Sequence, residues 1–166
     1  MYVGLQGSLF AYISKQVNTM TTDLRRILFM QLPRLENFMV SEEENFHLAG
    51  FYLAHALKHS DTYCDYRFRF MKPEEECLDD RHLVELITEW RPDVICGTLY
   101  LWNIERSLDI LKKVKHSHPE TLIICGGPEV APDHPFLFKE QIADALVMGE
   151  GEVILPEIIK AIQCGD

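Results

Sequence analysis

The sequence predicts an α/β fold, in which a five-stranded parallel sheet carries helices on both faces. Short apolar runs typical of buried strands alternate with longer segments whose apolar residues recur every three or four positions, as on one face of a helix. Gly or Pro follows several of the apolar runs and marks their ends. The chain has 166 residues, of which 47% are apolar and 25% charged, and this suits a single domain.

Five segments are predicted to form the strands. The first, Ile27-Leu28-Phe29-Met30, is a continuous apolar run, as expected for a strand that is buried on both faces. The second, residues 63–70, alternates only weakly and is expected to lie nearer an edge. The remaining strands are predicted at residues 93–98, 121–125 and 145–148, and glycines end the last two.

Amphipathic segments fill the intervals between the strands. Ser41 begins a capping box for a helix that is predicted to end near Ser60. The apolar face of that helix is predicted to comprise Phe46, Ala49, Leu53, Ala56 and Leu57. Further helices are predicted at residues 77–90, from the N-cap Asn103 onward and at 152–163, with a short helix between the last two strands. The apolar stripe of the Asn103 helix is predicted to comprise Ile104, Leu108, Leu111 and Val114.

This alternation favours the strand order 2-1-3-4-5 of flavodoxin-like folds, a Rossmann-like sandwich of three layers. Residues 23–166 are predicted to form this domain. Residues 1–22 show no clear pattern, and we expect a peripheral N-terminal extension: an upstream segment, a loosely held helix or residues added to the natural chain. In folds of this order, ligands bind at the carboxyl ends of the strands, near the point where the strand order reverses.

Composition and charge exclude several classes of function. Acidic residues outnumber basic ones by 26 to 16, and the net charge of −10 argues against nucleic-acid binding. No apolar run approaches the roughly 20 residues of a membrane span, and the N-terminus lacks the features of a secretory signal. The five cysteines are irregularly spaced and form neither CxxC nor CxxxCxxC. We therefore expect reduced, mostly buried thiols in a cytoplasmic protein.

Three loops that follow the central strands are predicted to meet at one edge of the sheet. They comprise residues 97–103, 126–130 and 149–152. Their glycines would let a ligand approach the backbone closely, and the first loop adds two aromatic rings and a threonine hydroxyl. This combination suits a large, mostly neutral ligand rich in rings better than a bare phosphate. The alternative is that the glycines merely end the strands and the aromatic side chains fill the core.

The motifs in these loops carry a family resemblance. Thr98-Leu-Tyr-Leu-Trp-Asn103, Gly126-Gly-Pro-Glu-Val130 and Gly149-Glu-Gly-Glu152 stand at spacings that closely resemble the N-terminal cobalamin-binding domain of B12-dependent radical SAM proteins. The similarity extends from about Arg25 to Gln163. The second and third motifs are fairly specific together, whereas each alone would be weak.

The resemblance implies cobalamin as the cofactor, with its corrin over the strand ends and its nucleotide tail in a slot beside Thr98. The implied cofactor-binding residues are Thr98, Tyr100, Leu101, Trp102, Asn103, Gly126, Gly127, Pro128, Glu129, Gly149, Glu150, Gly151 and Glu152. Thr98 would contact the tail, residues 100–103 would lie by the corrin, residues 126–129 would line the slot and residues 149–152 would close its side. Gln31-Leu32, after the first strand, is a weaker candidate.

One departure from related families concerns the ligand to cobalt. Methionine-synthase-type domains carry Asp-x-His-x-x-Gly, whose histidine ligates the cobalt. Here Asp80-Arg81-His82 matches the start of that motif, but Glu85 replaces the glycine and the segment falls in a predicted surface helix. The resemblance therefore implies a corrin held without this histidine, and it implies no catalytic or metal-ligating residue in this chain.

A second departure concerns catalysis. Radical SAM chemistry needs a 4Fe-4S cluster on CxxxCxxC, which these 166 residues lack. S-Adenosylmethionine and the cluster are therefore expected only in a radical SAM catalytic domain outside this chain, which would be a partner in cis or in trans. The chain is expected to be one domain of a larger enzyme or a standalone carrier, with no nucleic-acid or membrane partner.

Two other functional interpretations remain open. The chain could be a structural or interaction module of the same fold that no longer binds cobalamin, or a flavodoxin-like protein that binds a nucleotide or flavin. His55 and His59 share a helix face but have no evident third ligand, which favours a solvated pair over a metal site. Glu150 and Glu152 could form an acid–base pair, but Glu152 is expected to begin a helix.

Overall fold

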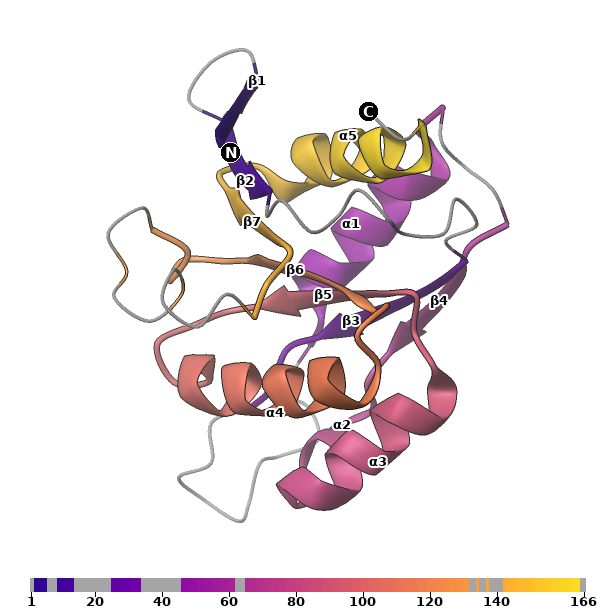
Figure 1. Cartoon of the computed structure of the whole chain (residues 1–166), viewed down its shortest axis with the longest axis vertical. Coiled ribbons are helices and arrows are strands. Elements are labelled where there is room, and N and C mark those ends of the chain that lie inside the picture. The colour runs from indigo at the N-terminus through magenta and orange to yellow at the C-terminus, as the bar shows by residue number, and fades with distance from the viewer. Residues whose placement is uncertain are drawn as a thin grey trace.

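The computed structural model describes residues 2–5, 9–13, 25–33, 46–61, 65–131, 134, 137 and 142–164. The centre of the molecule is one sheet (Figure 1), whose strands are β1 (Tyr2–Leu5), β2 (Leu9–Ile13), β3 (Arg26–Met30), β4 (Arg67–Phe70), β5 (Val94–Thr98), β6 (Leu122–Gly126) and β7 (Ala145–Met148). The strands lie in the order β1-β2-β7-β6-β5-β3-β4.

Five of these strands are parallel and confirm the predicted topology. Their spatial order, β4-β3-β5-β6-β7, is the predicted order 2-1-3-4-5. β3, β5 and β6 have a neighbouring strand on each side, and nearly all of their side chains are buried, which is why their sequences are continuous apolar runs. β4 lies at an edge, as expected, and its side chains are more exposed.

The N-terminal residues add a hairpin that the sequence pattern does not predict. β1 pairs with β2 and β2 pairs with β7, antiparallel in both cases, so that the sheet extends beyond its parallel strands. Phe10 pairs with Met148, and Ile13 pairs with Ala145. The hairpin covers an edge of β7 that would otherwise expose unpaired backbone groups. A domain boundary near residue 22 stays a prediction.

Helices cover both faces of the sheet and complete three layers (Figure 1). α1 (Leu48–Lys58) and α5 (Gly151–Cys164) lie side by side on one face, while α2 (Pro73–Glu76), α3 (Asp80–Trp90) and α4 (Ile104–Ser117) lie on the other. Each face has its own apolar core. The predicted stripe of α4 is confirmed, because all four of its residues are buried. None of the helices in the described part of the chain has the length and hydrophobicity that crossing a bilayer requires.

The buried face of α1 differs from the predicted one. Phe46 precedes the helix and is 63% exposed, whereas the buried positions of α1 are Gly50, Ala54 and Leu57. A Cβ atom at Gly50 would lie 3.0 Å from Cβ of Phe29, so this glycine lets α1 approach β3 closely. The face of α1 that contains Gly50 is therefore the buried one, and Phe46 lies outside it. The predicted capping box at Ser41 lies outside the described residues.

The helix predicted at residues 77–90 begins three residues later, as α3 at Asp80, and the short helix α2 precedes the predicted range. α3 begins there because the side chain of Asp79 accepts hydrogen bonds from the backbone N–H groups of Arg81 and His82 and so caps the helix. The short helix predicted between β6 and β7 falls on a segment of which the structure describes only part.

Candidate functional site

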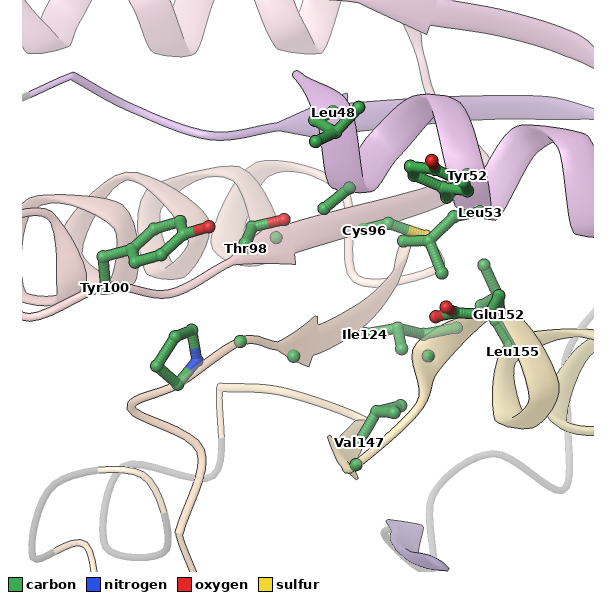
Figure 2. Close-up of a pocket in the computed structure, with 17 residues that line it drawn as sticks. Leu48, Tyr52, Leu53, Cys96, Thr98, Tyr100, Ile124, Val147, Glu152 and Leu155 are labelled. Atoms are coloured by element: carbon green, nitrogen blue, oxygen red, sulfur yellow. The ribbon is translucent and has the colours of Figure 1, made fainter. Parts of the chain in front are cut away.

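A cavity of about 350 Å³ lies over the carboxyl ends of β5, β6 and β7, between α1 and α5 (Figure 2). It occupies the sheet edge where the sequence predicts that three ligand-binding loops meet. Its walls come from all five elements and from the loops that join them. The lining residues are Leu48, Ala49, Tyr52, Leu53, Cys96, Gly97, Thr98, Tyr100, Ile124, Gly126, Gly127, Pro128, Val147, Gly149, Gly151, Glu152 and Leu155.

Two of the loops at the cavity are hydrogen-bonded to each other. The N–H of Leu99 donates to the carbonyl of Gly126 at 2.7 Å, and the N–H of Glu129 donates to the carbonyl of Leu99 at 3.3 Å. Gly127 has a φ of +110°, and a Cβ atom there would lie only 2.5 Å from the oxygen of Leu99. Only glycine fits such a position. This glycine therefore lets the two loops approach each other, and it lines the cavity together with Gly126, so that neither residue contributes a side chain to that wall.

Asn103 holds the loop that leaves β5. Its buried Oδ1 accepts a hydrogen bond from the N–H of Tyr100 at 2.9 Å, and its Nδ2 donates to the carbonyls of Leu32 at 3.0 Å and Thr98 at 3.2 Å. Asn103 immediately precedes α4, as predicted, but its side chain makes no capping hydrogen bond to that helix. It joins the ends of β3 and β5 instead, and thereby positions Thr98 and Tyr100 beside the cavity.

The buried part of the cavity lining is apolar. Four lining residues are no more than 5% exposed: Cys96, Ile124, Val147 and Leu155. In Figure 2 the side chain of Cys96 lies toward Leu53 of α1, and that of Ile124 lies toward Glu152 and Leu155 of α5. Burial raises the pKa of the Cys96 thiol, and the nearby Cys125 raises it further, so the thiol stays neutral. None of the four side chains carries a nitrogen or oxygen atom.

Polar side chains lie nearer the mouth of the cavity. They are Tyr52, Thr98, Tyr100 and Glu152, which are exposed or half-buried. Within the part of the chain that the structure describes, these four side chains make no hydrogen bond or ion pair. Glu152 is the only charged side chain among the lining residues described. The hydroxyls and the carboxylate are thus available to a ligand, and a mostly neutral ligand matches them better than a bare phosphate.

Large apolar side chains are exposed at or beside this mouth. Leu48 and Tyr52 line the cavity and are 55% and 59% exposed. The ring of Tyr100 stacks on that of Trp102, with centroids 4.5 Å apart and planes 8° apart. Leu101, between them, is 77% exposed. Such a concentration of exposed apolar surface is typical of a binding surface.

The structure brings most of the implied cofactor-binding residues to the cavity. Those that line it are Thr98, Tyr100, Gly126, Gly127, Pro128, Gly149, Gly151 and Glu152. Those that do not are Leu101, Trp102, Asn103, Glu129 and Glu150. Leu32, a weaker candidate, is fully buried outside the cavity. The binding role of every one of these residues stays a prediction.

The sequence analysis did not single out the wall that α1 contributes. Leu48, Ala49, Tyr52 and Leu53 all line the cavity, and Leu155 faces them from α5. A signal was present in the sequence: Leu48 and Tyr52 are spaced i, i+4 on a helix whose buried face lies elsewhere. Two large apolar residues outside the buried face of a helix indicate a surface that contacts something.

None of the described residues that line the cavity is a histidine. His82, from the partial DxHxxG motif, lies on α3 on the other face of the sheet, where its exposed side chain pairs with Asp79. The rings of His55 and His59 pack together with centroids 4.1 Å apart. In the described ranges, no group of three or more His, Cys, Asp or Glu side chains is placed to hold a metal ion.

Comparison with known proteins identifies a family that shares these loops. The sequence matches the B12 binding domain family over residues 40–159. The match covers most of the chain and includes every loop that borders the cavity.

Curated relatives are similar to this chain over part of their length. The cobalamin-dependent radical SAM methyltransferase TokK of Streptomyces tokunonensis is 41% identical over 70 residues, which are 41% of this chain and 10% of the relative. The hopanoid C-3 methylase of Methylococcus capsulatus is 32% identical over 80 residues, 44% of this chain and 15% of the relative. The anaerobic magnesium-protoporphyrin IX monomethyl ester cyclase of Cereibacter sphaeroides is 28% identical over 117 residues, 68% of this chain and 18% of the relative. The chain thus spans less than a fifth of the length of these relatives.

Proposed function

The chain belongs to the B12 binding domain family, and we propose that it holds a cobalamin at the cavity over β5, β6 and β7. The observation that carries the proposal is the wall of this cavity formed by Gly126 and Gly127. Both residues present only backbone to the cavity, and at Gly126 a Cβ atom would meet Val147 only at ordinary distances of 3.6 and 3.7 Å, so packing within the fold does not require a glycine there. A bare backbone wall, beside hydroxyls that bond to none of the described residues, suits a flat, bulky cofactor.

The size of the cavity supports a binding mode in which one part of the ligand lies inside the cavity and the other part lies outside. About 350 Å³ lies at the small end of the range for small-molecule sites and cannot enclose a whole corrinoid. The nucleotide tail would therefore occupy the cavity, beside Thr98 and Gly126. The corrin would lie outside, over the exposed apolar surface of Leu101 and Trp102. Asn103, whose side chain is fully engaged, would act by positioning the loop that carries these two residues.

The roles of the chain's own residues are binding, orientation and exclusion of water. When bound, cobalamin supplies a carrier of methyl groups or electrons. The Thr98 hydroxyl would contact the tail, and residues 149–152 would close the side of its slot. Because none of the described lining residues is a histidine, we propose that the corrin is held without a DxHxxG-type ligand. The position of His82 on the far face of the sheet supports this absence of a ligand.

Catalysis is assigned to another domain. The relatives named above include a cobalamin-dependent radical SAM methyltransferase, and this chain spans 10% of it. We therefore propose a radical SAM catalytic domain as the partner, in cis or in trans, with S-adenosylmethionine and a 4Fe-4S cluster bound there. The present residues contain no CxxxCxxC. The chain would then serve as the cobalamin module of that enzyme in the cytoplasm.

Spectroscopy on the purified chain tests the proposed function. The protein is mixed with hydroxocobalamin, free ligand is removed by gel filtration, and the visible spectrum of the protein peak is recorded. The expected result is a corrin band that elutes with the protein. A protein that is folded by circular dichroism but elutes without a corrin band would contradict the proposal and favour the structural module. Release of flavin fluorescence on denaturation would favour the flavodoxin-like alternative.

A further inference from the structure

Two titratable side chains are buried together although neither lines the cavity. His47, 6% exposed, immediately precedes α1, and Glu76, 0% exposed, is the last residue of α2. Nε2 of His47 is hydrogen-bonded to Oε1 of Glu76. Because α1 and α2 lie on opposite faces of the sheet (Figure 1), this bond joins the two outer layers of the fold. A buried carboxylate is costly unless it is paired, so the loss of His47 should have a strong local effect.

The acidic member of this pair is anchored to α4. Nη1 of Arg106 donates to the backbone carbonyl of Glu76 at 3.1 Å, and Nε of the same side chain donates to Oδ1 of Asp80 at 2.8 Å. Arg106 lies in the first turn of α4, three residues after Asn103, whose side chain holds the loop that carries Thr98. Glu76 is therefore tied to the same helix start that positions the Thr98 side of the cavity.

The histidine of the pair holds the start of α1, which has few other contacts. Among residues 46–49, only His47 is buried, and the buried face of α1 begins at Gly50. The side chain of His47 makes no capping hydrogen bond to α1, and the first turn contains no acidic residue. Leu48 and Ala49, which follow His47 directly, line the cavity, and Tyr52 lines it one turn later. The position of His47 therefore bears on where this wall of the cavity lies.

We propose that His47 is a positioning residue: its bond to Glu76 holds the first turn of α1 in place, and with it the cavity wall formed by Leu48, Ala49 and Tyr52. The bond supplies a direction that apolar packing alone does not, because a hydrogen bond requires a set distance and angle. Without it, the first turn has little buried surface to keep it on the sheet. This inference concerns the shape of the cavity and goes beyond the proposed function.

Alkylation of two cysteines in the full chain tests the position of this wall without any ligand. Cys96 lines the cavity, is 5% exposed and lies toward Leu53 of α1 (Figure 2), whereas Cys125 is buried in the core on the opposite face. Labelling by N-ethylmaleimide is followed at each cysteine by peptide mass spectrometry. His47→Leu should raise the labelling rate of Cys96 about tenfold or more and change that of Cys125 less than about twofold. An unchanged rate at Cys96, or equal rises at both cysteines, would overturn the proposal.

Three further variants distinguish the bond from a general need for histidine. His47→Gln keeps an N–H donor that can reach Glu76 and should restore most of the protection of Cys96. Glu76→Gln keeps the acceptor but removes its charge, and should raise the labelling rate of Cys96 by about threefold, even if His47→Leu does not fold. His82→Leu is the matched control, because it breaks the exposed His82–Asp79 pair at the start of α3 and should leave the rate unchanged. No rise in Glu76→Gln, or no rescue by His47→Gln, would contradict the role of this bond.

Titration with hydroxocobalamin links the wall to ligand binding, and this second readout rests on the proposed function. The dissociation constant should rise by about tenfold in His47→Leu and stay near the wild-type value in His47→Gln and His82→Leu. If the wild-type chain does not bind hydroxocobalamin while Cys96 labelling rises selectively in His47→Leu, the proposed function is overturned and the positioning role is supported. If the wild-type chain binds and His47→Leu binds equally tightly, His47 does not position the wall for this ligand and the inference is overturned.

Discussion

The two ends of the parallel strands differ in how their polar groups are used. At the amino ends, Asp93 accepts hydrogen bonds from the backbone N–H groups of Arg25 and Arg26, at 3.0 and 2.7 Å. Asp144 accepts from the N–H of Ile123 at 2.8 Å and from Nζ of Lys115 at 2.7 Å. These groups tie β3, β5, β6 and β7 to one another. They are satisfied within the fold and are not available to a ligand.

At the carboxyl ends, the polar side chains around the cavity are left unpaired. In the described residues Thr98, Tyr52 and Glu152 have no hydrogen-bond partner, and the nearby glycines keep one wall bare. Asn103 is the exception, because it is buried and fully bonded. The comparison teaches that the amino ends stabilise the sheet, while the carboxyl ends keep groups free for binding. Substitutions at the two ends should therefore separate stability from ligand affinity.

The largest effect is expected at Asp144. Asp144→Ala leaves the buried N–H of Ile123 without its acceptor and the ammonium of Lys115 with the carbonyl of Thr121 but no carboxylate, and should lower the free energy of unfolding by about 3–4 kcal/mol. Urea denaturation, monitored by circular dichroism, measures this loss of unfolding free energy. The counterpart at the other end, Thr98→Val, removes a hydroxyl that bonds to none of the described residues and should change the free energy of unfolding by less than about 0.5 kcal/mol. Equal losses for the two variants would contradict the comparison.

Asn103 lies at the carboxyl ends of the strands, but its substitution should lower the stability of the fold, as substitutions at the amino ends do. Asn103→Ala leaves the carbonyls of Leu32 and Thr98 and the N–H of Tyr100 without their partner, and should cost about 2–3 kcal/mol of unfolding free energy. Asn103→Asp, which keeps the acceptor but loses both donated hydrogen bonds, should restore little of it. Thermal melts of both variants provide the measurement. A stability within error of wild type would show that the loop does not depend on this side chain.

Substitution of Gly127 should cause a smaller loss of unfolding free energy, which arises from backbone strain. Gly127→Ala places a Cβ atom 2.5 Å from the oxygen of Leu99 at a φ of +110°, and should cost about 1–3 kcal/mol. Gly126→Ala is its neighbour and control, because a Cβ atom there would meet Val147 at ordinary distances of 3.6 and 3.7 Å. The urea midpoints of the two variants give the difference between their stabilities. If the two variants unfold at the same urea concentration, the close approach of the loops is not as described.

The smallest effect at neutral pH concerns the buried thiols. Burial raises the pKa of Cys96, and burial together with Asp144 raises that of Cys125 to about 12, from an ordinary value of 9.0. The unfolded chain therefore releases thiol protons that the folded chain keeps. The contribution to stability is complete below pH 9 and is lost as the pH rises from 9 toward the raised values, by about 1.4 kcal/mol per pH unit for each thiol. Cys125→Ala should flatten this decline in urea titrations above pH 9, and an unchanged slope would contradict the shift.

The fold was predictable where local pattern and global packing agree. β3, β5 and β6 are buried on both faces and read as apolar runs, and the stripe of α4 is regular. The start of α1 was not predictable in the same way, because its buried face follows Gly50, which carries no hydrophobic signal. The N-terminal hairpin was missed because its value lies in covering the edge of β7, and no local pattern expresses that.

The candidate site, like the fold, was predictable from the sequence only in part. The glycine loops were recognisable from their motifs, and their convergence follows from the parallel topology. The role of Asn103 could not be read from the sequence, since an N-cap residue and a buried bridge between strand ends look alike there. The contribution of Leu48 and Tyr52 was missed for a different reason. Their i, i+4 spacing shows a second apolar face of α1, but which face packs on the sheet depends on Gly50, which carries no hydrophobic signal.

Corrinoid titration of Gly126 variants tests the central claim, that this cavity holds part of a cobalamin, most directly. Gly126→Leu places a side chain in the cavity from a position where its Cβ atom fits without strain, and Gly126→Ala adds a single methyl group. Ile123→Val alters the same strand on the opposite face and is the control. We predict that Gly126→Leu weakens hydroxocobalamin binding by about tenfold or more, Gly126→Ala by less, and Ile123→Val not at all. A folded Gly126→Leu variant that binds hydroxocobalamin as tightly as the wild type would contradict the account.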